Sequence, residues 1–388
     1  MAYFKSLLAA LILWPALSAP IAAFDVQASS AFVKDMGTGT VLLTKNADVP
    51  LPPASMSKLM TLYVTFEAIR EGRITLEEEL SVSEHAMSFG GSTMFLDTTD
   101  RVSVEDLLRG IIVLSGNDAC VVLAEALSPD GTESGFARFM TERGIQMGMT
   151  NSVFVNSSGW PADGHVMSMR DLAILAERLI VDFPEYYPMF AETEFAFDGR
   201  APKNVLNRNP LLQLDIGADG LKTGHTQEAG YGLVGSAVQG DRRVIFVVSG
   251  IDSVGQRARE TEALVNWSFR QFTERKIAAA GEEVARADVW MGSAASVGLA
   301  PAEDLVTMVP ILSAGPLAAE IVYTGPVQAP IDAGQQVAEM VLSPEGMPEI
   351  RVPLMATEDV TAGGFVVRLR TVSGLLFQRL LQGAGEAS

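Results

Sequence analysis

The chain has 388 residues, of which 48% are apolar and 19% charged, and its formal net charge is -19. This length suggests two or three domains with buried cores, and the low content of charged residues argues against disorder. Because so acidic a chain repels phosphate backbones, nucleic-acid binding is disfavoured. One cysteine and three histidines exclude an internal disulfide and a typical zinc site, and we expect neither a metal nor another cofactor.

Residues 1–23 have the layout of a secretory signal peptide. Lys5 supplies a positive charge, residues 7–13 form an apolar run that Pro15 ends, and small residues follow as far as Ala22 and Ala23. The apolar run is too short for a comfortable membrane span. We therefore expect cleavage at about Ala22 or Ala23 and an exported, periplasmic protein. An uncleaved N-terminal anchor is the alternative.

Residues 24–276 carry the patterns of an α+β domain. A hairpin with a Gly-rich turn is expected at 30–45, and two further strands at 231–238 and 243–248. Apolar residues at helical spacing predict helices at 55–69, 104–114, 119–127, 135–144, 169–181 and 257–274. Strands at both ends of this region, with helices between them, favour an antiparallel sheet built from the two terminal segments.

The composition changes near residue 277. Residues 277–364 hold short strand candidates punctuated by Pro and Gly, which predict a small β-rich domain; these candidates are 289–291, 305–309, 321–323, 337–341 and 350–354.

Residues 365–388 return to helical spacing. The apolar positions are Phe365, Leu369, Val372, Leu376 and Leu380, with Arg368, Arg370 and Arg379 among them. This pattern predicts a C-terminal amphipathic helix that attaches peripherally to the outer face of the anionic inner membrane. A terminal helix packed on the β-rich domain is the alternative.

The segment Ser55-Met56-Ser57-Lys58 is the first candidate for chemistry. If a helix starts here, Ser55 and Lys58 lie one turn apart on the same face, so the amine reaches the hydroxyl. A buried lysine beside other cations has a lowered pKa and can activate a serine. Taken alone, the segment is far more typical of a helix N-cap followed by a solvated lysine.

Two later segments strengthen that interpretation. Ser115-Gly116-Asn117 follows a helical run, and Lys222-Thr223-Gly224 opens a strand ahead of His225. Taken alone, each segment is weak evidence for a catalytic site, because the first could be a helix cap and the second a turn. In this order the three segments match the motif set of class A β-lactamases and penicillin-binding proteins.

The sequence resembles the serine D-alanyl-D-alanine carboxypeptidases, the low-molecular-mass penicillin-binding proteins, over nearly its whole length. The similar stretches are 53–61, 115–120, 206–209 and 219–226. At the middle position of the second motif, β-lactamases of the first class carry Asp. This sequence has Gly116 there, which is the version found in the carboxypeptidase family. The resemblance implies an antiparallel five-stranded sheet flanked by helices, then a small all-β domain and a C-terminal amphipathic helix.

The resemblance also implies catalytic roles. Ser55 would attack the carbonyl between the two terminal D-alanines and form an acyl-enzyme, with Lys58 as general base. Ser115 would relay a proton to the leaving amine.

The remaining site residues would bind substrate. Asn117 would hold Lys58 and the substrate amide, Lys222 would set the electrostatics, and Thr223 would bind the terminal carboxylate. The oxyanion hole would come from the N–H groups of Ser55 and His225. Gly224, between Thr223 and His225, also belongs to the implied substrate-binding residues. Arg208 and Arg257 are either anion partners or members of surface salt bridges.

The implied substrate is the peptidoglycan stem pentapeptide, with β-lactam antibiotics as acylating ligands and a role in cell-wall synthesis and cell shape. A β-lactamase is disfavoured because no glutamate between the second and third motifs lies in an E-x-x-L-N segment. The intact motifs disfavour a non-catalytic wall-binding scaffold. Cleavage of cross-links by the same chemistry stays open. A Ser-His-Asp triad through His225 is disfavoured because no G-x-S-x-G segment is present.

Overall fold

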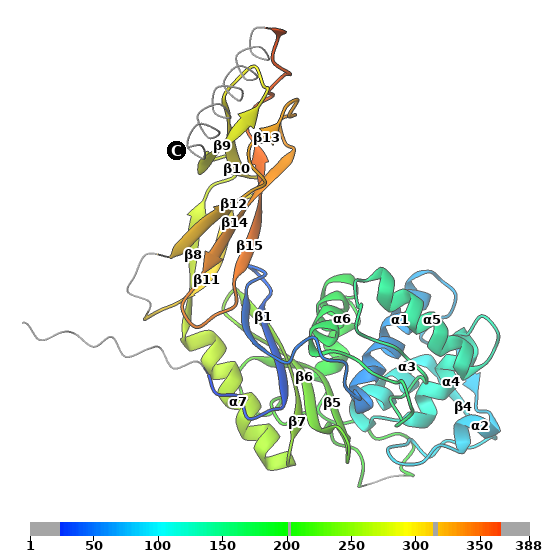
Figure 1. Cartoon of the computed structure of the whole chain (residues 1–388). Coiled ribbons are helices and arrows are strands. Elements are labelled where there is room, and N and C mark those ends of the chain that lie inside the picture. The colour runs from blue at the N-terminus through cyan, green and yellow to red at the C-terminus, as the bar shows by residue number, and fades with distance from the viewer. Residues whose placement is uncertain (1–23, 201–202, 313–316, 366–388) are drawn as a thin grey trace, which may run out of the picture.

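The computed structural model describes residues 24–200, 203–312 and 317–365. The predicted signal peptide and residues 366–388 of the predicted C-terminal helix lie outside this range. The described chain forms an α/β domain, from β1 to α7, and a C-terminal β domain, from β8 to β15 (Figure 1). Within the described residues, no helix is long and apolar enough to cross a membrane.

A five-stranded antiparallel sheet is the centre of the α/β domain. Its order is β2-β1-β7-β6-β5, with β1 at Ser30–Asp35, β2 at Val41–Lys45, β5 at Ala218–Thr226, β6 at Gly230–Gln239 and β7 at Arg242–Ile251. Strands from both ends of the domain pair through β1 and β7, as the sequence predicts. Strand β5 lies at the edge of this sheet.

Both faces of the sheet are covered, so β7 is apolar at successive positions. Ile245 and Val247 pack into the cluster of helices on one face, whereas Phe246 and Val248 pack against α7 (Val254–Arg270) on the other. Side chains alternate across a strand, and burial on both faces therefore requires a continuous apolar run. Figure 1 shows α7 on one side of the sheet and the other helices on the opposite side.

Those helices are α1 at Lys58–Arg70, α2 at Glu84–Met87, α3 at Val104–Arg109, α4 at Asn117–Leu127, α5 at Glu133–Gln146 and α6 at Met169–Asp182, with the short 3-10 helix η3 at Tyr187–Ala191 and the short strands β3 at Glu79–Ser81 and β4 at Arg101–Ser103. Helix α1 is buried over most of its length. Side chains cap several helices: Ser103 accepts from Asp106 N, Thr132 from Gly135 N and Ser168 from Asp171 N.

Two predicted helices differ from the structure. The predicted helix 104–114 is an α-helix only as far as Arg109, and Gly110–Leu114 forms the π-helix η2. The prediction of a helix at 257–274 is wrong at both ends. Ser253 caps α7 by accepting from Gln256 N, and the helix ends at Arg270, beyond which Phe272 is buried edge-on against Trp267 as the first residue of a strand.

The C-terminal β domain consists of strands alone in its described part. Strand β8 (Phe272–Ala278) pairs with β11 (Leu305–Pro310). A six-stranded sheet has the order β12-β14-β15-β10-β9-β13, with β9 at Ala285–Trp290, β10 at Ser296–Pro301, β12 at Ala318–Val322, β13 at Val327–Gln328, β14 at Gln336–Ser343 and β15 at Ile350–Ala356. The boundary predicted between residues 276 and 277 falls inside β8.

The two domains meet beside β1 and β2. Thr307 Oγ1 lies 3.0 Å from Thr40 Oγ1, and Met308 N donates to Thr40 Oγ1 at 3.1 Å. Met308 is fully buried in the cluster between the sheet and α7. The β8–β11 pair is therefore packed on the α/β domain.

Candidate active site

The serine of the first motif lies on a tight turn in front of α1. The 3-10 helix η1 (Ala54–Ser57) carries Ser55, and α1 begins at Lys58. Ala54 has a φ of 50°, and Gly159 approaches it so closely that a Cβ at residue 159 would lie 1.9 Å from the Ala54 carbonyl oxygen. The surrounding chain thus fixes the turn. Ser55 and Lys58 are adjacent as predicted, with 3.0 Å between Oγ and Nζ.

The amine of Lys58 is fully buried and reaches three oxygen atoms. Besides Ser55 Oγ, it donates to Asn117 Oδ1 at 2.7 Å and to the carbonyl of Ser158 at 2.5 Å. Burial lowers the pKa of Lys58 to about 8, and the positive charge of Arg208 acts in the same direction. The buried amine therefore loses its proton far more readily than a solvated lysine does.

Ser115 and Lys222 form a second pair next to the first. Ser115 follows the π-helix in a left-handed conformation, with a φ of 65°, and its Oγ accepts from Lys222 Nζ at 2.9 Å. Burial is the main cause that lowers the pKa of Lys222 well below its usual value, and Lys58 and Arg208 add to it. The charge of Lys58 thus disfavours the protonated form of Lys222.

The N-terminus of α4 connects the second motif to the first. Asn117 uses its amide at both ends, because Oδ1 accepts from Lys58 and Nδ2 donates to the Gly90 carbonyl at 2.8 Å. The buried carboxylate of Asp118 accepts from Met94 N at 3.0 Å and from Leu96 N at 3.1 Å. The loop that ends at residue 96 is thereby fixed beside the site.

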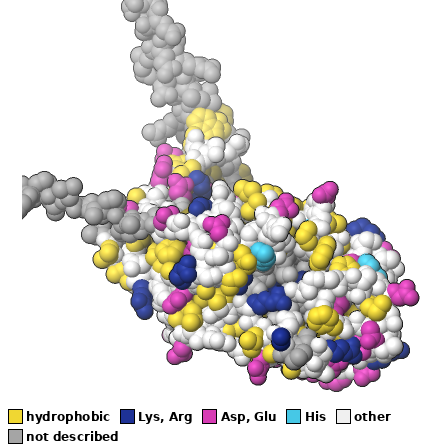
Figure 2. All heavy atoms as spheres, turned by 90° about the horizontal axis from the view of Figure 1, so that it is seen from below, with side chains coloured by type: hydrophobic (Ala, Val, Ile, Leu, Met, Phe, Trp, Pro, Cys, Tyr) yellow, Lys and Arg dark blue, Asp and Glu magenta, His cyan; other side chains and the backbone are white. Residues whose placement is uncertain are grey.

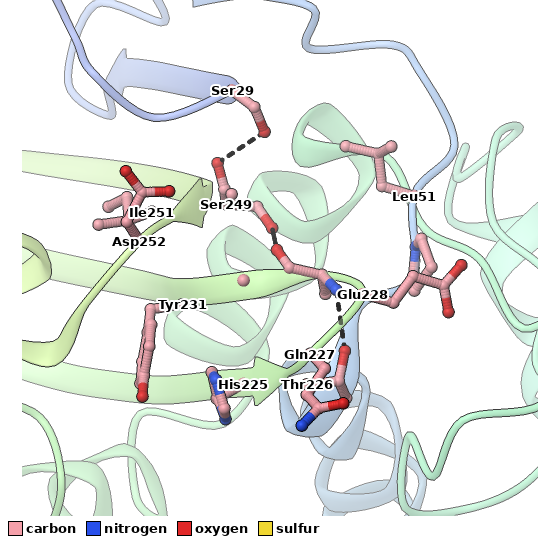
Figure 3. Close-up of a pocket in the computed structure, with 14 residues that line it drawn as sticks. Ser29, Leu51, His225, Thr226, Gln227, Glu228, Tyr231, Ser249, Ile251 and Asp252 are labelled. Atoms are coloured by element: carbon pink, nitrogen blue, oxygen red, sulfur yellow. Dashed lines mark hydrogen bonds between the residues drawn. The ribbon is translucent and has the colours of Figure 1, made fainter.

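The third motif lies on the edge strand β5. Lys222 and Thr223 are buried, and Gly224 packs against the first motif, where an added Cβ would lie 2.9 Å from Met56 and 3.0 Å from the Pro53 carbonyl. His225 is exposed, and its ring stacks on Tyr231 with 3.9 Å between centroids (Figure 3). No described residue forms a hydrogen bond with this imidazole.

Arg208 and Arg257 lie on the same side of the site as Lys222, and neither pairs with a carboxylate among the described residues. Arg208 donates to Ser92 Oγ at 2.7 Å and to the Leu114 carbonyl at 3.1 Å. Arg257 is 4% exposed; it donates to the Arg208 carbonyl at 3.1 Å, and its Nε has no partner. Burial lowers the pKa of both guanidinium groups. The alternative of surface salt bridges is not what the structure shows.

Two cavities lie beyond the nucleophile, at the end of β5. One of about 360 Å³ is lined by Pro52, the segment from His225 to Tyr231, and Ser249 to Asp252 (Figure 3). The other, of about 350 Å³, is lined by Ala54, residues 159–166, and Thr226 and Glu228. Figure 2 shows this face of the molecule, where a group of Lys and Arg side chains lies near the middle and most acidic side chains lie toward the edge.

Three contributors to the site carry no motif of their own. Ser158 acts through its backbone carbonyl, so its side chain gives no signal, and Asp118 is a buried anchor that follows the second motif. His165 has an imidazole 2.8 Å from Ser57 Oγ and is 3% exposed. No group of three or more His, Cys, Asp or Glu residues suited to a metal occurs in the described part.

The chain is similar to characterised proteins over both domains. The D-alanyl-D-alanine carboxypeptidase family model (peptidase S11) matches residues 16–253, and the model of the penicillin-binding protein 5 C-terminal domain matches 272–362. D-alanyl-D-alanine carboxypeptidase DacC of Escherichia coli is 36% identical over 354 residues, which are 89% of this chain and 87% of the relative.

Solved structures agree with this similarity. Penicillin-binding protein 5 from Haemophilus influenzae is 34% identical with a TM-score of 0.70, over 87% of this chain and 98% of that one. Penicillin-binding protein D2 from Listeria monocytogenes, in its ampicillin-bound form, is 32% identical with a TM-score of 0.57, over 64% of this chain and 99% of that one. The chain therefore belongs to the D-alanyl-D-alanine carboxypeptidase family S11.

Proposed function

We propose that this protein is a serine-type D-Ala-D-Ala carboxypeptidase that removes the terminal D-alanine from peptidoglycan stem pentapeptides through an acyl-enzyme on Ser55. Membership of the S11 family supports the reaction. The observation that carries the site assignment is the buried amine of Lys58, which lies 3.0 Å from Ser55 Oγ between two fixed oxygen acceptors.

The three contacts of Lys58 suit a neutral amine. A neutral amine has two N–H groups and one lone pair, and Asn117 Oδ1 and the Ser158 carbonyl take the two N–H groups. The lone pair is then left to accept the proton of Ser55. In the attack, the Oγ–C bond forms as Lys58 takes that proton, and the activated serine becomes acylated.

The pair of Ser115 and Lys222 serves the leaving group. When the C–N bond breaks, the departing amine takes a proton through Ser115 from the protonated Lys58, and D-alanine leaves. Lys222 keeps Ser115 oriented through its 2.9 Å contact. A water molecule then attacks the acyl-enzyme, and Lys58 accepts its proton and returns it to Ser55.

The terminal carboxylate of the substrate binds near two buried cations, Lys222 and Arg257, and the more exposed Arg208. Lys222, Arg208 and Arg257 lack carboxylate partners among the described residues, and Thr223 presents a hydroxyl next to them on β5. An anion placed there relieves the mutual repulsion of the cations. This arrangement requires a free C-terminal carboxylate, which is the mark of a carboxypeptidase substrate.

The backbone of Ser55 and His225 supplies the oxyanion hole in this proposal. Gly224 permits the close approach of β5 to the first motif, and this proximity supports the assignment of the two N–H groups to one oxyanion hole. Each such donor is worth about 3–4 kcal/mol of transition-state stabilisation in other acyl-transfer enzymes. The acyl part of the substrate continues past the end of β5 into the two cavities there.

The test is the variant Ser55→Ala. It removes the nucleophile without a change in packing, so both release of D-alanine and covalent labelling by fluorescent penicillin disappear while the circular dichroism spectrum stays the same. Ser343→Ala, which alters an exposed hydroxyl at the end of β14 in the β domain, is the matched control and keeps both activities. Turnover retained by Ser55→Ala would refute the proposed nucleophile.

The cellular location is part of the same proposal. The sequence patterns that predict a signal peptide at residues 1–23 and an amphipathic helix at 365–388 support a location in the periplasm, with peripheral attachment to the outer face of the cytoplasmic membrane. Deletion from Phe365 onward moves the protein from the membrane fraction to the soluble fraction with unchanged D-alanine release. Unchanged fractionation would show that the segment has a structural role only.

A further inference from the structure

The histidine at position 165 connects the nucleophile turn to the chain segment that holds Lys58. His165 Nε2 lies 2.8 Å from Ser57 Oγ, and both side chains are buried. Ser57 is the last residue of η1. It lies two positions after Ser55 and directly before Lys58, the first residue of α1. The contact is therefore made at the turn that sets the distance between nucleophile and base.

The direction of this hydrogen bond follows from the other side of the ring. Val155 N donates to His165 Nδ1 at 3.3 Å, so Nδ1 carries no proton. The proton of the neutral ring must then be on Nε2, which donates to Ser57 Oγ. Burial, and next the charge of Lys58, lower the pKa of His165 to about 4, so the ring stays neutral at physiological pH.

The segment from residue 153 to 167 holds the turn at several points. Leu51, which leads into the turn, exchanges two backbone hydrogen bonds with Met167, at 3.0 and 2.9 Å. The carbonyl of Ser158 accepts from Lys58 after the turn. His165 supplies the side-chain contact between these two, and it reaches the turn itself.

We propose that His165 is a positioning residue for acylation, in which the Nε2–H group donates to Ser57 Oγ and keeps the turn carrying Ser55 in register with the amine of Lys58. This role rests on the proposed acyl-enzyme on Ser55. A displacement of about 1 Å between reacting groups costs on the order of 100-fold in rate. Loss of the donor therefore lowers kcat and the acylation rate by about 10- to 100-fold, with KM nearly unchanged.

Two substitutions separate the donor from the rest of the ring. In His165→Gln, the amide nitrogen takes the place of Nε2 and still donates to Ser57. In His165→Asn, the shorter amide takes the place of Nδ1 and accepts from Val155 N, but it no longer reaches Ser57. Thr141→Val is the matched control, because Thr141 Oγ1 accepts from Phe154 N at 3.0 Å and so holds the same segment without a contact to the turn.

The experiment measures fluorescent-penicillin acylation and the kcat and KM of D-alanine release, with a melting temperature for each protein. We expect His165→Gln to stay within about threefold of the wild type and His165→Asn to lose about 10- to 100-fold in kcat. Thr141→Val is expected to lower the melting temperature and keep kcat. Wild-type rates in folded His165→Asn, or an equal loss in His165→Gln, would overturn the proposal.

A second variant keeps the test decisive if His165→Asn does not fold. Ser57→Ala removes the acceptor from the other side, and we expect the same loss in kcat, with no further loss when it is combined with a change at residue 165. Independent, multiplying losses would contradict a shared role. Failure of the wild-type protein to be acylated would refute the proposed function instead, so the two failures are distinguishable.

Discussion

The α/β domain and the β domain treat charged side chains in opposite ways. Around the site, the α/β domain buries Lys58, Lys222 and Arg257 with at most 4% of each exposed. In the described part of the β domain, Thr307 is the one buried polar side chain, and ion pairs such as Lys276 with Asp304 are about half exposed.

This difference indicates that the α/β domain carries the catalytic groups and that the β domain does not. Burial of a lysine costs free energy and lowers its pKa. This cost is offset only where an unprotonated amine is needed for catalysis. An exposed ion pair contributes little to stability and perturbs no reaction. We therefore expect substitutions of charged residues to affect catalysis in the first domain and to be tolerated in the second.

The largest expected effect is that of the buried lysine beside the nucleophile. Lys58→Met keeps an apolar stem of similar length and removes the base, so acylation by penicillin and release of D-alanine fall by roughly 10²- to 10⁴-fold. Lys276→Met is the matched control from the β domain, and its rates stay at the wild-type level. Stopped-flow acylation measures both. Equal effects of the two substitutions would contradict the contrast between the domains.

The next effect is a dependence on pH. Because the pKa of Lys58 is about 8, only a minority of free enzyme carries the neutral amine at pH 7. The second-order acylation rate rises about tenfold per pH unit below that value and levels off above it. The profile is recorded with a neutral-ester or β-lactam acyl donor from pH 5.5 to 9.5. A rate that is flat from pH 6 to 9 would show that another group is the base.

The smallest effect concerns stability. Asp118→Asn keeps the size of the side chain but replaces one acceptor oxygen with a donor facing backbone N–H groups, so the free energy of unfolding falls by about 1–3 kcal/mol. Asp304→Asn in the β domain keeps an oxygen that can accept from Ala280 N and loses the exposed contact of its other oxygen with Lys276, so the urea midpoint stays unchanged. A comparable shift in both variants would remove the distinction.

The parts of the site that lie within short segments could be predicted from the sequence. Ser55 and Lys58 are three residues apart, and the helical pattern after them fixes their geometry. The two later strands of the sheet were predictable for a similar reason, because the short apolar runs of β6 and β7 on either side of a polar turn are visible locally.

The rest depends on contacts between distant segments. Ser158 holds Lys58 through a backbone carbonyl, which any residue provides, and His165 reaches Ser57 across 108 positions. The end of α7 was misjudged because Phe272 continues the apolar pattern of the helix, although its ring packs against Trp267 from a strand. Periodicity does not distinguish these two placements of an aromatic residue.

The central claim is that Ser55 forms the acyl-enzyme with Lys58 as its base. Intact mass spectrometry with peptide mapping, on the purified protein without residues 1–23 and after exposure to benzylpenicillin, tests it directly. The account predicts one covalent adduct, mapped to Ser55, that lasts for minutes or longer. An adduct on another residue, or rapid consumption of penicillin with no adduct detected, would contradict it, and the second result would indicate a β-lactamase.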